Sequence, residues 1–325
     1  MKKNILLLLI LIQFTAFGTE ENLQHPFLIV TKDTYPDLRE KLKDPFFKEI
    51  RDYCSTRWNS SNISISLYSS SLMYILSPHP WYKQRILSKL DQWANKVGEL
   101  NHKEFAAYVP PAATQFYAII ALDIIYNDLS LEEKQESLAN IDTVAQFYLN
   151  NPASWKLAEY GINLLYSIFK RDTLEINKWK TLYDERLFTY SLAEDNSWTS
   201  SSGYFHARMN SGRLAKNGII DVMDFTGIGN YYKDIRVQEM FEWSTTFSLT
   251  PFGTYTALGE TTVTTENRLG IARNFFFAEK YGDKISNQIN WFLENEDIKK
   301  LPITTDPLFV YILRSSSISK KKKMP

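Results

Sequence analysis

The sequence predicts an all-α protein, and three observations support that prediction. Apolar residues recur every three or four positions along almost the whole chain, which is the period of a helix buried on one side. No alternating run of β-branched residues is long enough to indicate a sheet. Short segments rich in Pro, Asn and Gly separate the helical stretches, so consecutive helices are expected to pack as antiparallel neighbours.

The helical segments can be followed in order along the chain. The first opens at Thr31 with Pro36 in its first turn, and a capping box at Ser130 and Glu133 opens the segment that ends near Tyr148. The expected buried side of the first segment is Leu38, Leu42, Phe46, Phe47 and Ile50. The other helices are expected at residues 66–76, 81–97, 113–126, 154–170, 173–193, 209–225, 237–249, 266–281 and 285–292.

Two helical architectures fit this pattern: an irregular solenoid, or a closed toroid of helix pairs with a cleft at one end. No fixed-period repeat of the solenoid type is present, and periodicity alone does not choose between them. A polar segment rich in Thr and Gly, residues 250–265, interrupts the helical frame and contains a lone Glu260. Such a loop is a natural part of a binding cleft.

The N-terminus has the organisation of a secretory signal peptide. Lys2 and Lys3 precede a short apolar run over residues 5–12, and small residues follow at Ala16 and Gly18. The run is shorter than the roughly 20 residues that span a bilayer, so the mature chain is expected to have no membrane span and to be periplasmic or secreted. We expect a signal peptide over residues 1–18, one helical domain over 19–312, and a Lys-rich tail over 313–325.

Composition excludes some classes of partner. Lys plus Arg and Asp plus Glu both number 37, so there is no global basic field of the kind that binds nucleic acid. Cys54 is the only cysteine, which rules out an intramolecular disulfide and a cysteine metal site, and its helical context predicts an inert core residue.

The segment Asp195-Asn-Ser-Trp-Thr-Ser-Ser-Ser-Gly-Tyr-Phe-His-Ala-Arg-Met-Asn210 carries the strongest chemical signal. It begins as a turn and then places Tyr204, His206 and Arg208 within five residues at the expected start of a helix. A phenol, an imidazole and a guanidinium together can hold a proton, transfer a proton and bind a carboxylate. The pattern points to an enzyme that acts on an acidic substrate.

Several pieces in sequence order resemble one family. They are His25-Pro-Phe-Leu-Ile-Val-Thr-Lys-Asp-Thr-Tyr-Pro-Asp-Leu38, Asn150-Asn-Pro-Ala-Ser-Trp155, the Gly203-Tyr204 turn, Asp224-Phe-Thr-Gly-Ile-Gly-Asn230 and Gly259-Glu260. Together they resemble the toroid domain of the heparinase II/III-like polysaccharide lyases, with alginate lyases of related fold as the second match. The resemblance covers most of residues 27–283 and implies an (α/α) toroid of paired antiparallel helices.

The resemblance also implies a β-elimination on a uronic-acid-containing polysaccharide. Tyr204 would be the proton donor to the leaving sugar oxygen, and Asn151 or its neighbour Asn150 would bind the uronate carboxylate. Removal of a proton α to a carboxylate builds charge on that acid, which an Asn or Arg donor stabilises. A Tyr or His takes the proton. This arrangement requires neither a metal nor another cofactor.

The chain departs from the family pattern at two points. Family members often carry a His at or near the position after the Asn, but here Pro152 follows Asn151, and His206 and His102 are the substitutes for the base. Family members also continue into a β-sandwich domain, so an incomplete toroid without that domain is expected here. Further candidates for substrate contact are Arg208, Asn150, Trp155, Trp198 and Glu260.

Each candidate also has a structural reading. Tyr204 and His206 fit packing roles at a helix start, Arg208 fits a surface ion pair, Asn151 fits a helix cap, and the tryptophans fit core positions. Two other functions therefore stay open. One is a non-catalytic or truncated glycan-binding toroid protein. The other is an (α/α)-toroid glycoside hydrolase, which needs two carboxylates from a set such as Glu159, Asp195 and Glu260.

Overall fold

The structure is a computed structural model that describes residues 24–99, 109–150, 156–195, 216–246 and 307–313. These residues are mostly helical, and no strand occurs among them, which confirms the predicted all-α class. None of the described helices combines the length and the apolar composition needed to cross a bilayer.

The helices follow one another in the order expected for helical hairpins. Their bounds are α2 Tyr35–Glu40, α3 Pro45–Arg57, α4 Ile63–Leu76, α5 Pro80–Glu99, α7 Val109–Ile125, α8 Leu131–Asn150, α9 Lys156–Lys170, α10 Thr173–Phe188, α12 Lys216–Thr226, α13 Ile235–Thr246 and α17 Pro307–Leu313. Short 3-10 helices are η2 Lys32–Thr34, η3 Lys41–Lys43, η4 Tyr126–Asp128 and η6 Tyr231–Lys233.

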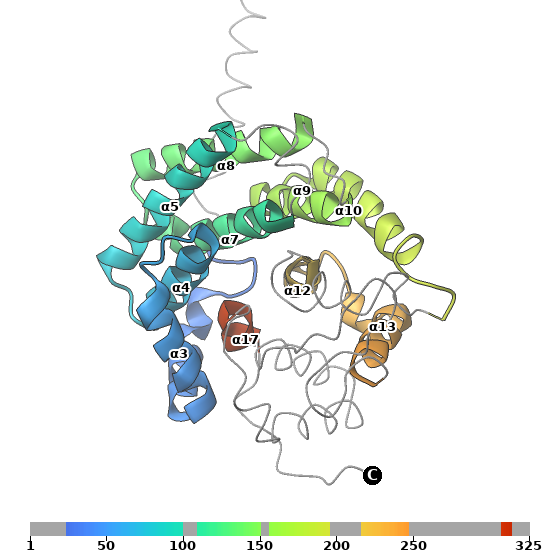
Figure 1. Ribbon diagram of the computed structural model, residues 1–325, viewed down its shortest axis with the longest axis horizontal. Coiled ribbons are helices and arrows are strands. Elements are labelled where there is room, and N and C mark those ends of the chain that lie inside the picture. The colour runs from blue at the N-terminus through green and yellow to red at the C-terminus, as the bar shows by residue number, and fades with distance from the viewer. Residues whose placement is uncertain (1–23, 100–108, 151–155, 196–215, 247–306, 314–325) are drawn as a thin grey trace, which may run out of the picture.

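The larger helices form a two-layered arc (Figure 1). The inner row is α4, α7, α9 and α12, in which each helix contacts the next. The outer row contains α5, α8 and α10, which pack against the inner row and continue toward α13 on the far side of the arc. The short helix α17 lies inside the curve of the arc and contacts α3 and α4.

Sequence explains which helices lie inside. From Ala112 to Ile125 every residue of α7 is buried, and α4 is buried over almost its full length. A helix that is apolar around its whole circumference must be covered on all sides. By contrast α10 buries only Trp179, Tyr183 and Leu187, which is the single stripe of a surface helix.

The inner helices run parallel to one another. Near the C-termini, the Tyr74 hydroxyl donates to Asp128 just beyond α7 at 2.9 Å, and the rings of Tyr126 and Phe169 lie 5.9 Å apart. Near the N-termini of α9 and α12, a Cβ on Gly161 would lie 3.0 Å from the Ile219 side chain. Each inner helix is therefore joined to the following outer helix by a short turn at one common end.

We call this the hairpin end, defined by the connections at residues 77–79, 126–130, 171–172 and 227–234. The opposite end, which we call the crossover end, holds the C-termini of α5, α8 and α10 and the N-termini of α7, α9 and α12.

The first predicted helix is broken in the structure. Residues 31–50 were expected to be continuous, but η2, α2 and η3 precede a separate α3 that begins at Pro45. The residue before a proline is driven out of the helical region, and Asp44 is accordingly extended, with ψ of 124°. Its carboxylate accepts from the Phe46 amide at 2.9 Å and caps the new helix. The predicted burial is confirmed for Leu38, Phe47 and Ile50, whereas Leu42 and Phe46 are only half-buried.

Most other boundaries agree with the expected ranges to within a few residues. The largest difference is α10, which was expected to reach residue 193 and ends at Phe188. The predicted helices at 266–281 and 285–292, and the part of 209–225 before Lys216, lie outside the described residues. Helix α17 was not predicted; it is only seven residues long and almost entirely buried.

The segment that follows the expected signal peptide is held by one buried carboxylate. Asp123 of α7 is fully buried, and its Oδ1 lies 2.6 Å from Nδ1 of His25. Its Oδ2 accepts from the backbone amides of Phe27 and Leu28, each at 3.0 Å. The side-chain amide of Asn127 (Nδ2) donates to the His25 carbonyl at 2.9 Å. Because the carboxylate replaces the partners that these donors lose on burial, the segment is fixed to the hairpin end.

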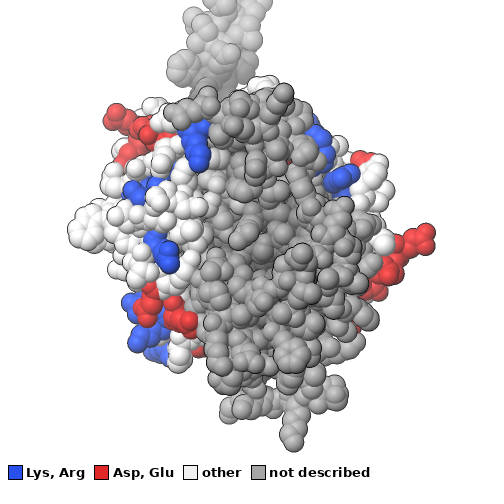
Figure 2. Space-filling view, viewed as in Figure 1, with Lys and Arg blue, Asp and Glu red and all other residues white. Residues whose placement is uncertain are grey.

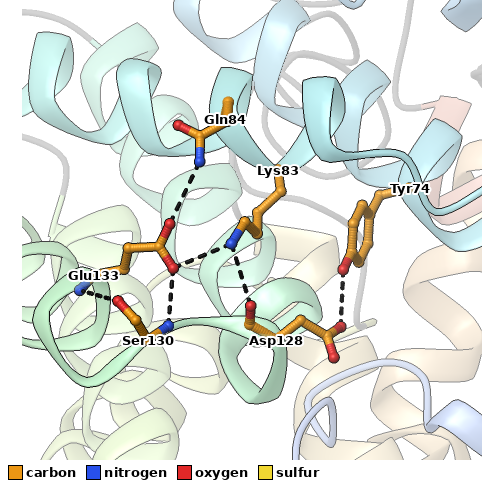
Figure 3. A network of polar contacts seen from close by, with 6 residues as sticks. All are labelled: Tyr74, Lys83, Gln84, Asp128, Ser130 and Glu133. Carbon is orange, nitrogen blue, oxygen red and sulfur yellow. Dashed lines mark hydrogen bonds and ion pairs between the residues drawn. The ribbon is translucent and has the colours of Figure 1, made fainter.

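A polar network joins α4, α5 and α8 at the hairpin end (Figure 3). The predicted capping box is present: the Ser130 amide donates to Glu133 at 2.8 Å, and the Glu133 amide donates to the Ser130 hydroxyl at 3.1 Å. Lys83 of α5 donates to Glu133 of α8 at 3.1 Å and to the Asp128 carbonyl just before α8 at 3.3 Å, so it bridges α5 and α8. The other Asp128 contacts are with Tyr74 and Lys32.

This network predicts an acid-sensitive contribution to stability. The Ser130 amide, with help from Lys83, lowers the pKa of Glu133 below its ordinary value of 4.5. A carboxyl with a lowered pKa stabilises the fold above that ordinary value and loses this effect as the pH falls through its pKa in the folded state. Glu133→Gln is therefore expected to reduce the free energy of unfolding by about 0.5 to 1.5 kcal/mol at pH 7. The difference should be smaller at pH 3 than at pH 7.

Urea unfolding at the two pH values measures this change. Glu132→Gln is the matched control, because Glu132 is the exposed neighbour in the same helical turn. An equal loss at both pH values in Glu133→Gln would show that the ionised carboxylate is not responsible.

Candidate functional site

Of the predicted site residues, the structure describes one. Asn150 is the last residue of α8 and is exposed at the crossover end. The others lie outside the described residues: Tyr204, His206, Arg208, Asn151, Trp155, Trp198 and Glu260, together with the alternative base His102.

The helix ends on either side of these residues share one end of the molecule. Asn150 ends α8, and α9 begins at Lys156. On the other side, α10 is followed by described residues as far as Asp195, and α12 begins at Lys216. All four helix ends belong to the crossover end, because the inner helices are parallel (Figure 1). The two sequence segments with the strongest chemical signal therefore depart from the same end of the arc.

The first turns of α9 place polar side chains at the crossover end. Lys156 Nζ lies 2.9 Å from Oε2 of Glu159, a carboxylate whose side chain is 8 % exposed. One turn further, Asn163 is buried, and its Nδ2 has no hydrogen-bond partner among the described residues. Residues four apart lie on one face of a helix, so Glu159 and Asn163 share a face. A buried amide donor without a partner is costly and marks a position for a polar contact.

The neighbouring inner helices also carry polar groups near their N-termini. The hydroxyls of Ser64 and Thr114 lie 2.7 Å apart between α4 and α7. The Trp93 indole donates to Gln115 Oε1 at 2.9 Å. These contacts are satisfied within the protein and fix the packing of the inner row, whereas Asn163 Nδ2 lacks a hydrogen-bond partner among the described residues.

Helix direction gives the crossover end its electrostatic character. The N-termini of α7, α9 and α12 all lie there, and each helix N-terminus carries a partial positive charge of about half a unit. The described surface itself has no field of one sign on the face in Figure 2, where Lys and Arg are interspersed with Asp and Glu around the rim. The C-termini of α5, α8 and α10 lie at the same end and carry the opposite partial charge, so a helix dipole favours an anion there only directly against one of the inner N-termini.

A second group of residues, which sequence reasoning did not select, lies at the hairpin end. A cavity of about 270 Å³ is bounded by α12, α17, η2, α2 and the segment held by Asp123. Asp221 is buried, and its Oδ1 accepts a hydrogen bond from the Tyr232 hydroxyl. Asp224 is half-buried one turn later on the same helix. The only signal in the sequence was two carboxylates three residues apart beside Phe225.

The adjacent Tyr231 makes a similar contact with a different helix. Its hydroxyl donates to Asp184 of α10, and Lys180 Nζ lies 2.5 Å from the other oxygen of that carboxylate. Burial, with the Asp184 hydrogen bond, raises the pKa of the Tyr231 phenol well above its ordinary value. Two consecutive tyrosines therefore tie η6 to α10 through Asp184 and to α12 through Asp221.

The remaining histidines and the cysteine have structural positions. His25 is buried in contact with Asp123, and His79 is exposed before α5 with its ring centroid 4.4 Å from that of Trp81. Cys54 is fully buried, as predicted, and burial raises the pKa of its thiol to about 12, so a reactive thiolate is absent at this position near neutral pH. Within the described part of the chain, no three His, Cys, Asp or Glu side chains are arranged to hold a metal ion.

Comparison with known proteins adds no family: no protein-family model matches the chain, and no curated protein matches it.

Proposed function

We propose that the chain is an exported polysaccharide lyase-like protein that cleaves a uronic-acid-containing polysaccharide by β-elimination. The proposed site is at the crossover end and uses Tyr204 as the proton donor to the leaving sugar oxygen, with His206 as the base. Asn151 or Asn150 binds the uronate carboxylate together with Arg208. Trp155, Trp198 and Glu260 complete the contacts with the sugar chain.

One observation carries the proposal. The helix ends that flank the Asn150 and Tyr204 segments lie together at the end where the inner helix N-termini converge. An elimination next to a carboxylate develops negative charge on the substrate, and the N-terminus of α9 or α12 would favour such charge on a group bound directly against it. The two-layered arc of antiparallel helix pairs is also the arrangement expected of a toroid domain.

Export is proposed from the sequence. Lys2, Lys3, the apolar run at 5–12 and the small residues Ala16 and Gly18 form the signal. A periplasmic or secreted location suits a protein that meets a polysaccharide outside the cell.

The hydrolase alternative draws on three carboxylate candidates. Glu159 is paired with Lys156 inside the first turn of α9, and Asp195 is exposed beyond α10. The third candidate, Glu260, lies outside the described residues. The hydrolase therefore stays the second candidate, and the reaction products distinguish it from the lyase.

Absorbance near 232 nm tests the proposal, because only elimination creates a conjugated double bond in the product. We expect this absorbance to rise when the full chain is incubated with one of a panel of acidic polysaccharides: alginate, heparin, heparan sulfate, hyaluronan and polygalacturonate. New reducing ends without the absorbance would establish hydrolysis instead. Binding without either signal would establish the non-catalytic glycan-binding alternative.

A further inference from the structure

Exposed apolar side chains gather at the hairpin end. Among the described residues, seven large apolar residues are exposed, and five of them lie at this end. Four of these five occupy the first turn of a different outer helix. They are Trp81 in α5, Leu131 in α8, Leu174 in α10 and Ile235 in α13, which are 66, 74, 82 and 59 % exposed. Single exposed apolar residues are common, but a group of them at one end of a molecule indicates an interaction surface.

The apolar residues stand among charges of both signs. Leu131, Leu174 and Ile235 each lie between two polar neighbours in the sequence. Each of their turns contains one acidic and one basic residue: Glu132 and Lys134, Asp172 and Arg171, Asp234 and Arg236. These turns therefore carry no charge of one sign that would attract nucleic acid or an acidic surface. The apolar residues are also single points, unlike the continuous apolar core of a stable protein interface.

A bilayer surface accepts separate apolar side chains of this kind. Leu and Ile side chains gain free energy at the head-group boundary in proportion to the apolar area that they bury there. Trp is enriched at the same depth, because its ring is apolar and its N–H is polar. Zwitterionic head groups carry one charge of each sign, which matches turns that pair an acidic with a basic side chain.

The chain before the described residues also leads from this end. His25 is bound to Asp123 near the C-terminus of α7, so residue 24 lies at the hairpin end. The apolar run at residues 5–12 precedes it, and the intervening residues 13–23 can span at most about 40 Å. During the proposed export this run enters the bilayer, which brings the hairpin end within that distance of the membrane. This step rests on the proposed export, whereas the exposure of the four apolar residues does not.

We propose that the hairpin end is a membrane-docking face that binds the surface of a zwitterionic phospholipid bilayer. Trp81, Leu131, Leu174 and Ile235 insert among the head groups, and the charged residues beside them stay at head-group level. In this orientation the crossover end, with the lyase site proposed there, points away from the bilayer. Docking requires no lyase activity.

The two ends of α8 provide a matched pair of positions for the test. Leu131 at the hairpin end and Leu149 at the crossover end are both exposed, and they lie about 27 Å apart along the helix. Leu131→Cys and Leu149→Cys are made separately in the full chain, and the new thiol is labelled with a polarity-sensitive NBD fluorophore. Cys54 is fully buried, so it stays unlabelled in the folded protein. When phosphatidylcholine vesicles are added, we expect a blue shift and a rise of the emission at position 131 and neither change at position 149.

Further variants measure the contribution of the other residues. In the labelled Leu131→Cys protein, Trp81→Ser and Leu174→Ser should each raise the vesicle concentration at half-maximal shift about fivefold or more. Leu149→Ser in the same protein is the control and should leave that concentration unchanged. Circular dichroism of each variant verifies the fold.

Three results would overturn the proposal. The first is no shift at position 131, or an equal shift at both positions, since the apolar run at residues 5–12 alone would then hold the chain at the membrane. The second is a shift that needs no lipid and grows with protein concentration, because a second copy would then cover this end. The third is binding only to vesicles that contain phosphatidylglycerol, lost at high salt, because the contact would then be electrostatic. No polysaccharide is present, so the result is independent of the lyase proposal.

Discussion

Tyr204→Phe is expected to abolish elimination while it leaves the fold intact. Phenylalanine keeps the ring and removes only the hydroxyl that we propose returns a proton to the glycosidic oxygen. General acid–base groups contribute about 100- to 10,000-fold to rate, which corresponds to roughly 3 to 5 kcal/mol of activation free energy. Loss of the hydroxyl should change the free energy of unfolding by only about 1 kcal/mol.

The measurement is the initial rate at 232 nm on the polysaccharide identified in the substrate panel. His206→Ala belongs in the same series, because it should be strongly impaired if His206 is the base and unaffected if the imidazole only packs. Near-normal activity of Tyr204→Phe on a verified substrate would show that the turn around Gly203 is not the catalytic centre.

Asp123→Ala is expected to cause the largest loss of stability in the described part of the chain. The change removes the acceptor for the His25 ring and for the amides of Phe27 and Leu28, all within a site closed to water. Removal of one partner from a buried charged network costs about 3 to 5 kcal/mol, because the remaining donors cannot recover their hydrogen bonds to water.

Urea denaturation of the protein gives this value directly. Asp123→Asn keeps the shape and one acceptor oxygen, so its loss should be smaller, at about 1 to 2 kcal/mol. The exposed control Asp142→Ala should change stability by no more than about 0.5 kcal/mol. A loss under about 1 kcal/mol in Asp123→Ala would mean that the segment at residues 25–30 is held mainly by its apolar contacts.

Local signals in the sequence were sufficient to predict where helices occur, but not where one helix is interrupted and the next begins. The capping box at Ser130 and Glu133 is formed by two residues in one turn, so it is readable without any tertiary knowledge. The break at Asp44 and Pro45 carried an equally local signal, but the apolar spacing from Leu38 to Ile50 continued across it. A periodic pattern can thus continue from one helix into the next when both bury the same side.

Long-range contacts explain what sequence reasoning did not find. The role of Asp123 depends on residues almost one hundred positions earlier, and nothing near Asp123 in the sequence indicates them. Likewise Asp221 and Asp224 become part of a cavity only when the fold brings α17 and residues 29–30 to the same place as α12. The predicted residues of the proposed lyase site, except Asn150, lie outside the described residues, so their arrangement stays a prediction.

The position of α17 has a consequence for the order in which the chain folds. Each helical hairpin is built from neighbours in the sequence, and local contacts form early because little loop-closure entropy opposes them. The contacts of α17 are instead long-range. The Tyr311 hydroxyl donates to the Leu38 carbonyl at 3.0 Å, and Lys41 donates to the Tyr311 carbonyl at 2.9 Å. Both hydrogen bonds join residues about 270 positions apart in the sequence. The arc should therefore assemble hairpin by hairpin, and α17 should dock last. Until it does, the apolar sides of α3 and α4 stay uncovered, and aggregation competes with folding at that stage.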